Sequence, residues 1–390
     1  MSPLASDKAT SKADPGETAP PGGQKAARIS LAAAARTGAA LIATFAVGLV
    51  GGYLARLLHF PLPYMTGSLL ATAALGLAGV PVRSVWQARA AGQFVTGAAV
   101  GTSFTPAILL TLLALLPAII VGDAISMLIG AAGALILMRL TQIDHKTAFL
   151  AAMPGGVIEM ANVAVRVGAD PLPIMVLQTM RVGLTVCIAP FLVTVLAEHG
   201  THHEVVQAAT MPWLTVAALM AASLVGGLVL RLLRVPNCWF LGSIITIAAI
   251  AAFGLVTGRV PDSILIVAQV IIGTSIGTQY RHEFLTRLLR LLLASFVIVP
   301  FALLTLGLLG ALYALALALP LPTMVLALAP AGIAEMALTG KVLGLDAALI
   351  TVFHMGRILI VLLGAAPACR AFEWLASHQA RFPNGTNGSA

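Results

Sequence analysis

Two stretches of this sequence, residues 153–181 and 329–357, are copies of one another at a constant offset of 176 residues. The residues shared by the two copies are Pro154/Pro330, Gly156/Gly332, Glu159/Glu335, Met160/Met336, Gly168/Gly344, Asp170/Asp346 and Arg181/Arg357. Earlier segments repeat at nearly the same offset, since Gln93 matches Gln269 and Gly51 matches Gly226. An internal duplication of this extent predicts a fold built from two similar halves.

The composition indicates which solvent surrounds those halves. The sequence is 59% hydrophobic and 9% charged, whereas a soluble domain has about a quarter of its residues charged. In the first half the apolar runs lie near residues 38–58, 64–80, 91–103, 106–122, 124–140, 147–165 and 172–197. We therefore predict an all-α polytopic membrane protein with about ten to fourteen hydrophobic segments.

Polar segments divide the chain into five parts. We predict a disordered cytoplasmic tail, a first membrane repeat, a polar linker, a second membrane repeat and a polar tail, at residues 1–28, 38–197, 198–211, 212–376 and 377–390. The first tail is rich in Pro, Gly, Ser and Lys, a composition that cannot bury a core. The two repeats could be parallel or inverted in the membrane; we favour inverted repeats because paired broken-helix sites are most often built that way.

Two runs in each half are interrupted or too short for a full crossing. Residues 91–103 are rich in Gly and Thr, and residues 147–165 contain Pro154, Gly155 and Gly156. The second copy of the latter break contains Pro330 and Gly332. Because lipid tolerates unpaired backbone groups only beside protein or water, we predict half-helices or re-entrant segments that border a polar cavity.

Charged side chains accompany both breaks. Glu159 and Glu335 each follow a proline by five residues, and Arg181 and Arg357 lie deep within later apolar runs. A charge at that depth costs at least about 2.5 kcal/mol, so we expect the four side chains to converge on one cavity. A guanidinium there suits a carboxylate or phosphate ligand. The alternative is that each arginine only neutralises its own glutamate in a buried pair.

Other repeated residues have simpler expected roles. Gln178 and His354 each precede an arginine by three residues, so we expect them on the same helix face, lining the same pocket. Helix packing is the first explanation for Gly97, Gly101, Gly273 and Gly277, with close approach to a ligand as the alternative. Asp170 and Asp346 are expected to cap helices, and Lys341, whose counterpart is Val165, is expected to be a loop charge.

Several of these motifs together resemble the AbrB-type family of bacterial membrane proteins, over residues 38–372. They are Gly97, Gly101 and Phe104, then MPGGVIEM, then GAD, then Gln178 with Arg181. Members of the family are labelled ammonia monooxygenases, transporters or regulators of gene expression. The second copy departs from the motif, with Ala331, Leu338 and His354 in place of Gly155, Asn162 and Gln178. We add Asn162 to the candidate binding residues and expect the two copies to differ in function.

The sequence favours one of those labels. We see no HxxxH pair on a helix, no nucleotide-binding loop and no DNA-reading element, and the histidines of EHGTHHE fit a polar loop as well as a metal site. We predict a secondary transporter of a small, anionic solute in the bacterial inner membrane, driven by protons or ions, without cofactor, metal or direct nucleic-acid binding. The second hypothesis is a membrane sensor that affects gene expression indirectly; a monooxygenase is third. Its partners would be the solute and the lipid bilayer, with a homo-oligomer left open.

Overall fold

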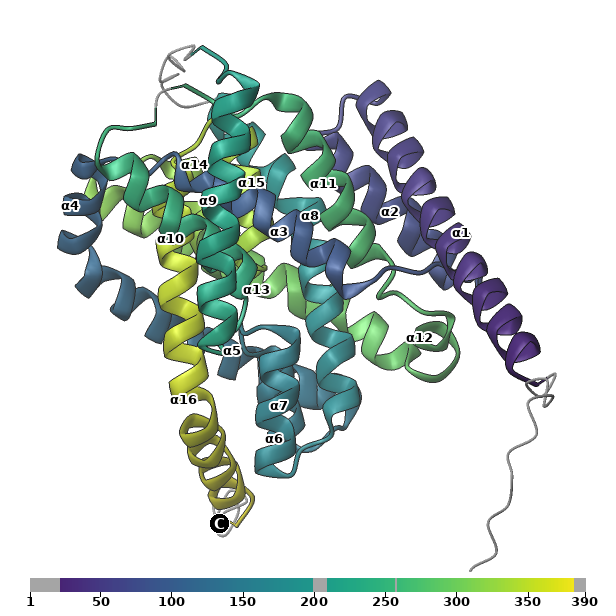
Figure 1. Cartoon of the computed structure of the whole chain (residues 1–390). Helices are drawn as coiled ribbons and strands as arrows, with labels where there is room; N and C mark the ends of the chain where they lie inside the picture. Colours follow the sequence, from purple (N-terminus) through teal and green to yellow (C-terminus); the bar gives the residue numbers. More distant parts are fainter. Residues whose placement is uncertain (1–21, 199–208, 257, 382–390) are drawn as a thin grey trace, which may run out of the picture.

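The computed structural model describes residues 22–198, 209–256 and 258–381, which form sixteen helices (Figure 1). The first eight are α1 (Gly22–Leu57), α2 (Pro63–Leu77), α3 (Trp86–Gly101), α4 (Pro106–Ala114), α5 (Leu116–Thr141), α6 (His145–Ala152), α7 (Val157–Val167) and α8 (Pro171–Glu198). The second eight are α9 (Trp213–Leu232), α10 (Cys238–Ala252), α11 (Asp262–Gly277), α12 (His282–Arg287), α13 (Leu289–Leu317), α14 (Leu321–Leu328), α15 (Ile333–Val342) and α16 (Ala347–Arg381). Taken in order, each helix of the first set has a counterpart in the second.

The described helices are those of a membrane protein. Seven of them are long and apolar enough to cross a bilayer, or eight if the bent pair α3–α4 counts as one span. The other hydrophobic segments that we predicted correspond to α2, α10 and the half-helices on either side of each break. Large apolar side chains on the outer helices are exposed, including Leu214 and Leu315, as expected of surfaces that face lipid. The predicted class, an all-α polytopic membrane protein, is confirmed.

The chain ends differ from our expectation where they are described. α1 begins at Gly22 and includes residues 22–28, which we assigned to the tail. The reason is its Ala-rich and Lys/Arg-rich sequence, since these residues are strong helix formers. Similarly, α16 continues to Arg381, into the predicted polar tail. Residues 1–21, 199–208 and 382–390, which hold the rest of the predicted tails and most of the linker, lie outside the described residues.

The helix break in the middle of the first half lies earlier than we predicted. We separated runs 106–122 and 124–140 at Asp123, but α5 continues through Asp123. The interruption instead separates α4 from α5 at Leu115. Thr105 caps α4 by accepting a hydrogen bond from the Ile108 amide at 3.3 Å, and Pro117 is tolerated in the first turn of α5, where its missing N–H is not needed. The short run near 91–103 does end at a sharp bend, 98° between α3 and α4.

Helices of the two halves interlock through glycine contacts. α3 packs against α10, and its counterpart α11 packs against α2. A Cβ atom added to Gly97 would lie 2.5 Å from the Phe240 carbonyl oxygen, too close for any side chain. The four predicted glycines lie against the facing helix as follows: Gly97 on Phe240, Gly101 on Ile247, Gly273 on Met65 and Gly277 on Leu69. Close helix packing therefore accounts for these glycines.

Corresponding helices run in opposite directions. Ser84, just before α3, has its Oγ 3.2 Å from the Oγ of Ser275 near the end of α11. Tyr313, near the end of α13, donates a hydrogen bond to the Ala118 carbonyl at the start of α5 at 2.9 Å. α3 with α11 and α5 with α13 are therefore antiparallel. The two-fold rotation that relates the two halves has its axis perpendicular to these helices.

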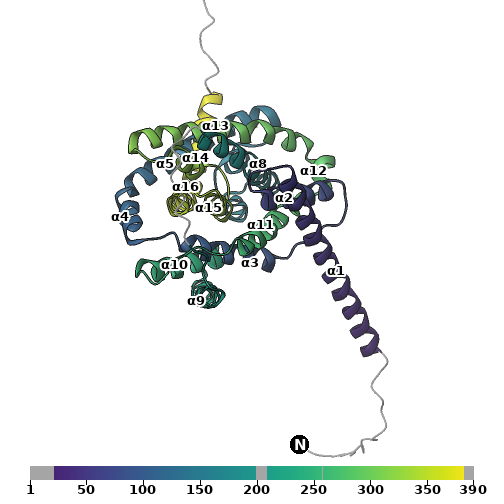
Figure 2. The ribbon, with the colours of Figure 1, turned by 90° about the horizontal axis from the view of Figure 1, so that it is seen from above.

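Seen from above, the broken helix of the second half lies in the interior (Figure 2). Around α14, α15 and α16, α5 and α13 lie along one side and α3 and α10 along the opposite side, with α9 outside α10. α1 lies at the periphery and extends away from the bundle. The break between α14 and α15 is therefore surrounded by protein on all sides in this view.

Candidate functional site

The two helix breaks have the same backbone structure. α6 ends at Ala152 and α7 begins after Gly156, while α14 ends at Leu328 and α15 begins after Gly332. Gly156 has φ −78° and ψ 151°, and Gly332 has φ −75° and ψ 150°. No side chain caps either helix start by a hydrogen bond, so both helices leave their first N–H groups free of side-chain caps.

Arginines from the following helices bind the carbonyl groups that the breaks expose. Arg181 on α8 is 5% exposed and donates from its two terminal nitrogens to the carbonyls of Met153 and Gly155. Arg357 on α16 is 3% exposed and donates to Ala329 and Ala331, each at 2.8 Å. A guanidinium has a rigid fork that can reach both carbonyls at once. Positive charge also suits a helix C-terminus.

These contacts replace the arginine–glutamate pairs that we considered as the alternative. Neither Arg181 with Glu159 nor Arg357 with Glu335 forms an ion pair among the described residues. Each arginine instead binds two carbonyls of the segment that joins its two half-helices. The guanidinium groups of Arg181 and Arg357 are therefore held in place by backbone contacts.

Gln178, His354 and Asn162 lie away from the position that we expected. Gln178 is fully buried, and its amide donates to the carbonyls of Leu150 at 3.0 Å and Met153 at 2.9 Å. His354 is fully buried against Arg357, with its Nδ1 2.5 Å from Nη2. The exposed Asn162 lies on α7. None of the three lines the cavity between the breaks. Gln178 shares the Met153 carbonyl with Arg181, and His354 contacts Arg357 directly.

Each glutamate is the third residue of its half-helix and folds back over the glycine that precedes the helix. A Cβ atom at Gly156 or Gly332 would collide with the carboxylate of Glu159 or Glu335 respectively. An acidic side chain at this position complements the positive end of the helix dipole. The Gly-x-x-Glu spacing is therefore explained by local structure in both copies.

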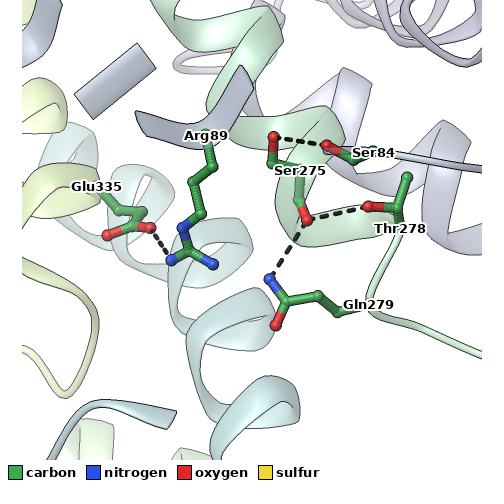
Figure 3. Close-up of polar contacts among 6 residues, drawn as sticks. All are labelled: Ser84, Arg89, Ser275, Thr278, Gln279 and Glu335. Carbon is green, nitrogen blue, oxygen red and sulfur yellow. Dashed lines mark hydrogen bonds and ion pairs between the residues drawn. The ribbon is translucent and has the colours of Figure 1, made fainter. Parts of the chain in front are cut away.

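The glutamates differ in their partners. Glu335 forms a salt bridge with Arg89 on α3 at 3.0 Å, and its side chain is 2% exposed (Figure 3). The residue corresponding to Arg89 in the second half is Leu265, and Glu159 has no salt bridge among the described residues. The sequence analysis missed Arg89 because it lies 246 residues from Glu335 and no local motif marks it.

Both breaks line one cavity of about 150 Å³, which we call the crossover cavity. Its charged lining residues are Arg89, Glu159, Arg181, Glu335 and Arg357. Residues of both breaks also line it, including Pro154, Gly155, Gly156 and Gly332. Three arginines against two glutamates leave one net positive charge. The structure thus brings together the two sets of residues that the sequence places 176 positions apart.

A second cavity of about 570 Å³, here the Lys341 cavity, lies at the other end of α15. Lys341 lines it together with Arg56 and Arg259. Lys341 belongs to α15 and donates to the hydroxyl oxygens of Thr102 at 3.1 Å and Ser103 at 2.8 Å. Our expectation of a loop charge was wrong, because α15 extends one residue past the lysine.

The structure also shows a buried acid that the sequence analysis did not select. Asp123 on α5 is 1% exposed, and Gly356 of α16 lies against its carboxylate. A single acid within an apolar run indicates a candidate functional residue, and by this criterion we selected Glu159. We had assigned Asp123 to a junction between two segments and so did not consider it as buried.

Among the described residues, no three His, Cys, Asp or Glu side chains come together as metal ligands could. The predicted loop histidines His202 and His203 lie in the segment outside the described residues. Asp170 and Asp346 are in the expected capping positions, accepting hydrogen bonds from the amides of Leu172 and Leu349.

Comparison with known proteins places this architecture in a family. The profile of a family described as "Transition state regulatory protein AbrB" matches residues 64–373. "Uncharacterized protein YhjN" of Bacillus subtilis (strain 168) is 26% identical over 379 residues, covering 88% of this chain and 96% of the relative. "Putative regulator AbrB" of Escherichia coli (strain K12) is 27% identical over 327 residues, covering 82% and 92%. Neither name denotes an enzyme. Since the profile covers most of the chain, this protein belongs to the AbrB family.

Proposed function

We propose that this membrane protein is a secondary transporter of a small anionic solute in the bacterial inner membrane, driven by a proton or ion gradient. The observation that carries the proposal is the crossover cavity, which both helix breaks line. Discontinuous helices that meet between two repeats form the substrate sites of many secondary transporters. The solute would bind between the ends of α7 and α15.

The charges of the crossover cavity favour an anion. The N-terminal ends of α7 and α15 border the cavity, and helix N-termini attract negative charge. Arg89, Arg181 and Arg357 add positive charge that Glu159 and Glu335 only partly offset. The volume of about 150 Å³ is several times the roughly 30 Å³ that one water occupies in the liquid. A solute with few non-hydrogen atoms fits that space.

The arrangement of the halves supports movement of the solute rather than binding alone. Corresponding helices are antiparallel, as the α3–α11 and α5–α13 contacts indicate. This is the relation expected of inverted repeats, in which one half rocks against the other around a central site. The Lys341 cavity, at the far end of α15, would then lie on the route between the central site and one membrane surface.

Flux into proteoliposomes tests the proposal. We expect purified protein to take up radiolabelled phosphate, sulfate or succinate faster than protein-free liposomes, with uptake saturating as the anion concentration rises. Mannitol serves as the neutral control and should not be taken up. Equal uptake of anions and mannitol, or no uptake above protein-free liposomes for all three anions, would contradict the proposal.

The second candidate is a membrane sensor that binds the same kind of solute without moving it. The observation in its favour is that the family description contains the word regulatory and the name of the Escherichia coli relative the word regulator. The same preparation separates the two functions. A sensor would be stabilised by an anion in a thermal-shift assay but would show no flux.

A further inference from the structure

Asp123 is a buried acid that lies outside the lining of the crossover cavity. It lies about two turns into α5, is 1% exposed, and has no hydrogen-bond partner for either carboxylate oxygen among the described residues. Removing an ionised carboxylate from water without donors costs several kcal/mol. The carboxylate therefore needs either a nearby positive charge or a bound proton.

The helices packed on α5 supply one such charge. They are α4, α6, α13 and α16. α4 carries no titratable side chain. Those of the other three helices are His145 and Lys146 of α6, Arg290 and Tyr313 of α13, and His354, Arg357, Cys369, Arg370, Glu373, His378 and Arg381 of α16. Lys146 is paired with Glu373 at 3.3 Å, and the Tyr313 hydroxyl donates to Ala118. Arg357 is the cation that directly follows Gly356, whose backbone lies against the Asp123 carboxylate.

The contact between Asp123 and α16 depends on a glycine. A Cβ atom added to Gly356 would lie 2.9 Å from Oδ2 of Asp123 and 2.6 Å from Cγ2 of Ile119. The carboxylate therefore lies directly against the backbone that precedes Arg357. Arg357 in turn lines the crossover cavity, so the residue that follows this contact belongs to the proposed solute site.

The other half lacks this arrangement. At the offset of 176 residues, Asp123 corresponds to Val299 and Gly356 corresponds to Met180. Both of these residues are buried, at 2% and 3% exposed. The acid and the small residue that makes room for it occur together in one half, and two apolar side chains replace them in the other.

We propose that Asp123 is a proton-binding site that couples a proton to anion binding at Arg357, which makes the protein a proton–anion symporter. The inference rests on the proposed transport function. Ionised Asp123 offsets the positive charge of Arg357 and weakens the attraction for the solute. When Asp123 takes up one proton, its carboxylate becomes a neutral carboxyl group and the Arg357 charge is available to the anion. One proton and one negative charge then bind together, and both leave together.

Infrared spectroscopy of the purified chain in lipid nanodiscs tests proton binding without reference to transport. A protonated carboxyl group has a C=O stretch that an ionised carboxylate lacks. The other carboxyl groups of the chain absorb in the same region and cancel when the spectra of wild type and variant are subtracted. We expect the wild-type spectrum to contain a component that disappears as pH is raised, that Asp123→Asn lacks and that Asp170→Asn retains. The last variant changes an exposed capping acid and is the matched control. A band that persists at every pH at which the protein is folded, or none at any pH, would overturn the proposal.

Flux measurements test the coupling itself. A proton gradient of one pH unit should support about tenfold accumulation of a singly charged anion if one proton accompanies it. Asp123→Asn should keep anion exchange but lose this accumulation, and Asp123→Val, which copies Val299, should do the same with an equal or higher melting temperature. Accumulation that survives in both variants would overturn the coupling role. Absence of flux in wild type would contradict the transport proposal instead, and the infrared result would still stand.

Discussion

The first and second helix breaks share a backbone but not their charged neighbours. In both, an arginine from the next helix spans two carbonyls, and a glutamate folds back over the glycine at the helix start. Only in the second break is the glutamate paired with an arginine, Arg89, and only there does a buried acid, Asp123, lie beside the helix, among the described residues. The scaffold, its arginines and its glutamates are therefore repeated, whereas Arg89 and Asp123 have apolar counterparts, Leu265 and Val299.

The comparison of the two breaks distinguishes residues that stabilise the broken helix from residues that could bind a solute or proton. A feature present in both halves, such as the arginine clamp, is explained by the unpaired carbonyls of a broken helix. A feature present in one half has no such explanation and is the better candidate for function. By this criterion Arg89, Asp123 and Lys341 deserve more weight as functional residues than Glu159.

The largest expected effect comes from removing the clamps. Arg181→Ala takes the arginine from the Gly155 carbonyl and one of several donors from the Met153 carbonyl, and should lower the free energy of unfolding by about 3 kcal/mol. Arg357→Ala should cost more, because it also leaves Asp123 without its offsetting charge. Denaturant titration of each variant in mixed micelles measures both losses.

A double substitution sharpens this first comparison. Adding Asp123→Val should recover part of the loss in Arg357→Ala and none of the loss in Arg181→Ala. Equal recovery in both backgrounds would mean that Asp123 acts on the fold generally and not through Arg357.

The next effect concerns the glycines between the halves. Gly97→Ala should destabilise the protein by about 2 kcal/mol, because the new Cβ atom meets a backbone carbonyl that cannot move aside cheaply. Gly133→Ala in α5 is the matched control, since the nearest atom to its Cβ would be 3.7 Å away. Thermal unfolding in detergent should show a lower melting temperature for the first variant only, and an unchanged one would contradict the close packing of α3 on α10.

A smaller difference is expected between the two glutamates. Glu335→Gln should cost about 1 kcal/mol, since it weakens a salt bridge whose arginine is partly exposed, whereas Glu159→Gln should be nearly neutral. A double-mutant cycle of Glu335→Gln with Arg89→Ala isolates the pair. A coupling energy of zero would show that the Glu335–Arg89 contact contributes nothing to stability.

The smallest expected effect on stability is at Lys341. Lys341→Val copies Val165 of the first half and should change the free energy of unfolding by about 0.5 kcal/mol. The change is small because the Ser103 side chain still lines the Lys341 cavity and the Thr102 hydroxyl still donates to the Ala99 carbonyl. If that cavity lies on the solute route, the same variant should slow anion uptake while leaving mannitol exclusion intact. Unchanged anion uptake would remove the Lys341 cavity from the route.

Much of the fold could be predicted because it depends on local patterns. Pro154 and Pro330 with their glycines mark both breaks, and the constant offset pairs the halves. The position of Asp123 within α5 could not be read from hydropathy, because a single acid looks the same at a helix junction and inside a helix. The sequence also left open a pairing of Arg181 with Glu159, since a charge pattern does not reveal that backbone carbonyls can be the preferred partners.

The contacts between distant segments were beyond prediction from the chain alone. Arg89 reaches Glu335 only because α3 packs beside α15, and Lys341 reaches Ser103 at the other end of the same pair of helices. Both contacts depend on how the halves interlock. A duplicated sequence specifies that there are two halves, but it does not specify how they are docked.

The central claim is that both breaks serve one binding site, and protection of paired cysteines tests it most directly. Val182 and Ile358 occupy corresponding positions, and both line the crossover cavity. With Cys187, Cys238 and Cys369 first replaced by alanine, Val182→Cys and Ile358→Cys report on the two halves separately, and the exposed position in Asp170→Cys is the control. We predict that the anion taken up in the flux assay slows thiol labelling at 182 and 358 with the same half-saturating concentration and leaves 170 unchanged. Protection at only one position, or at two different concentrations, would contradict a shared site.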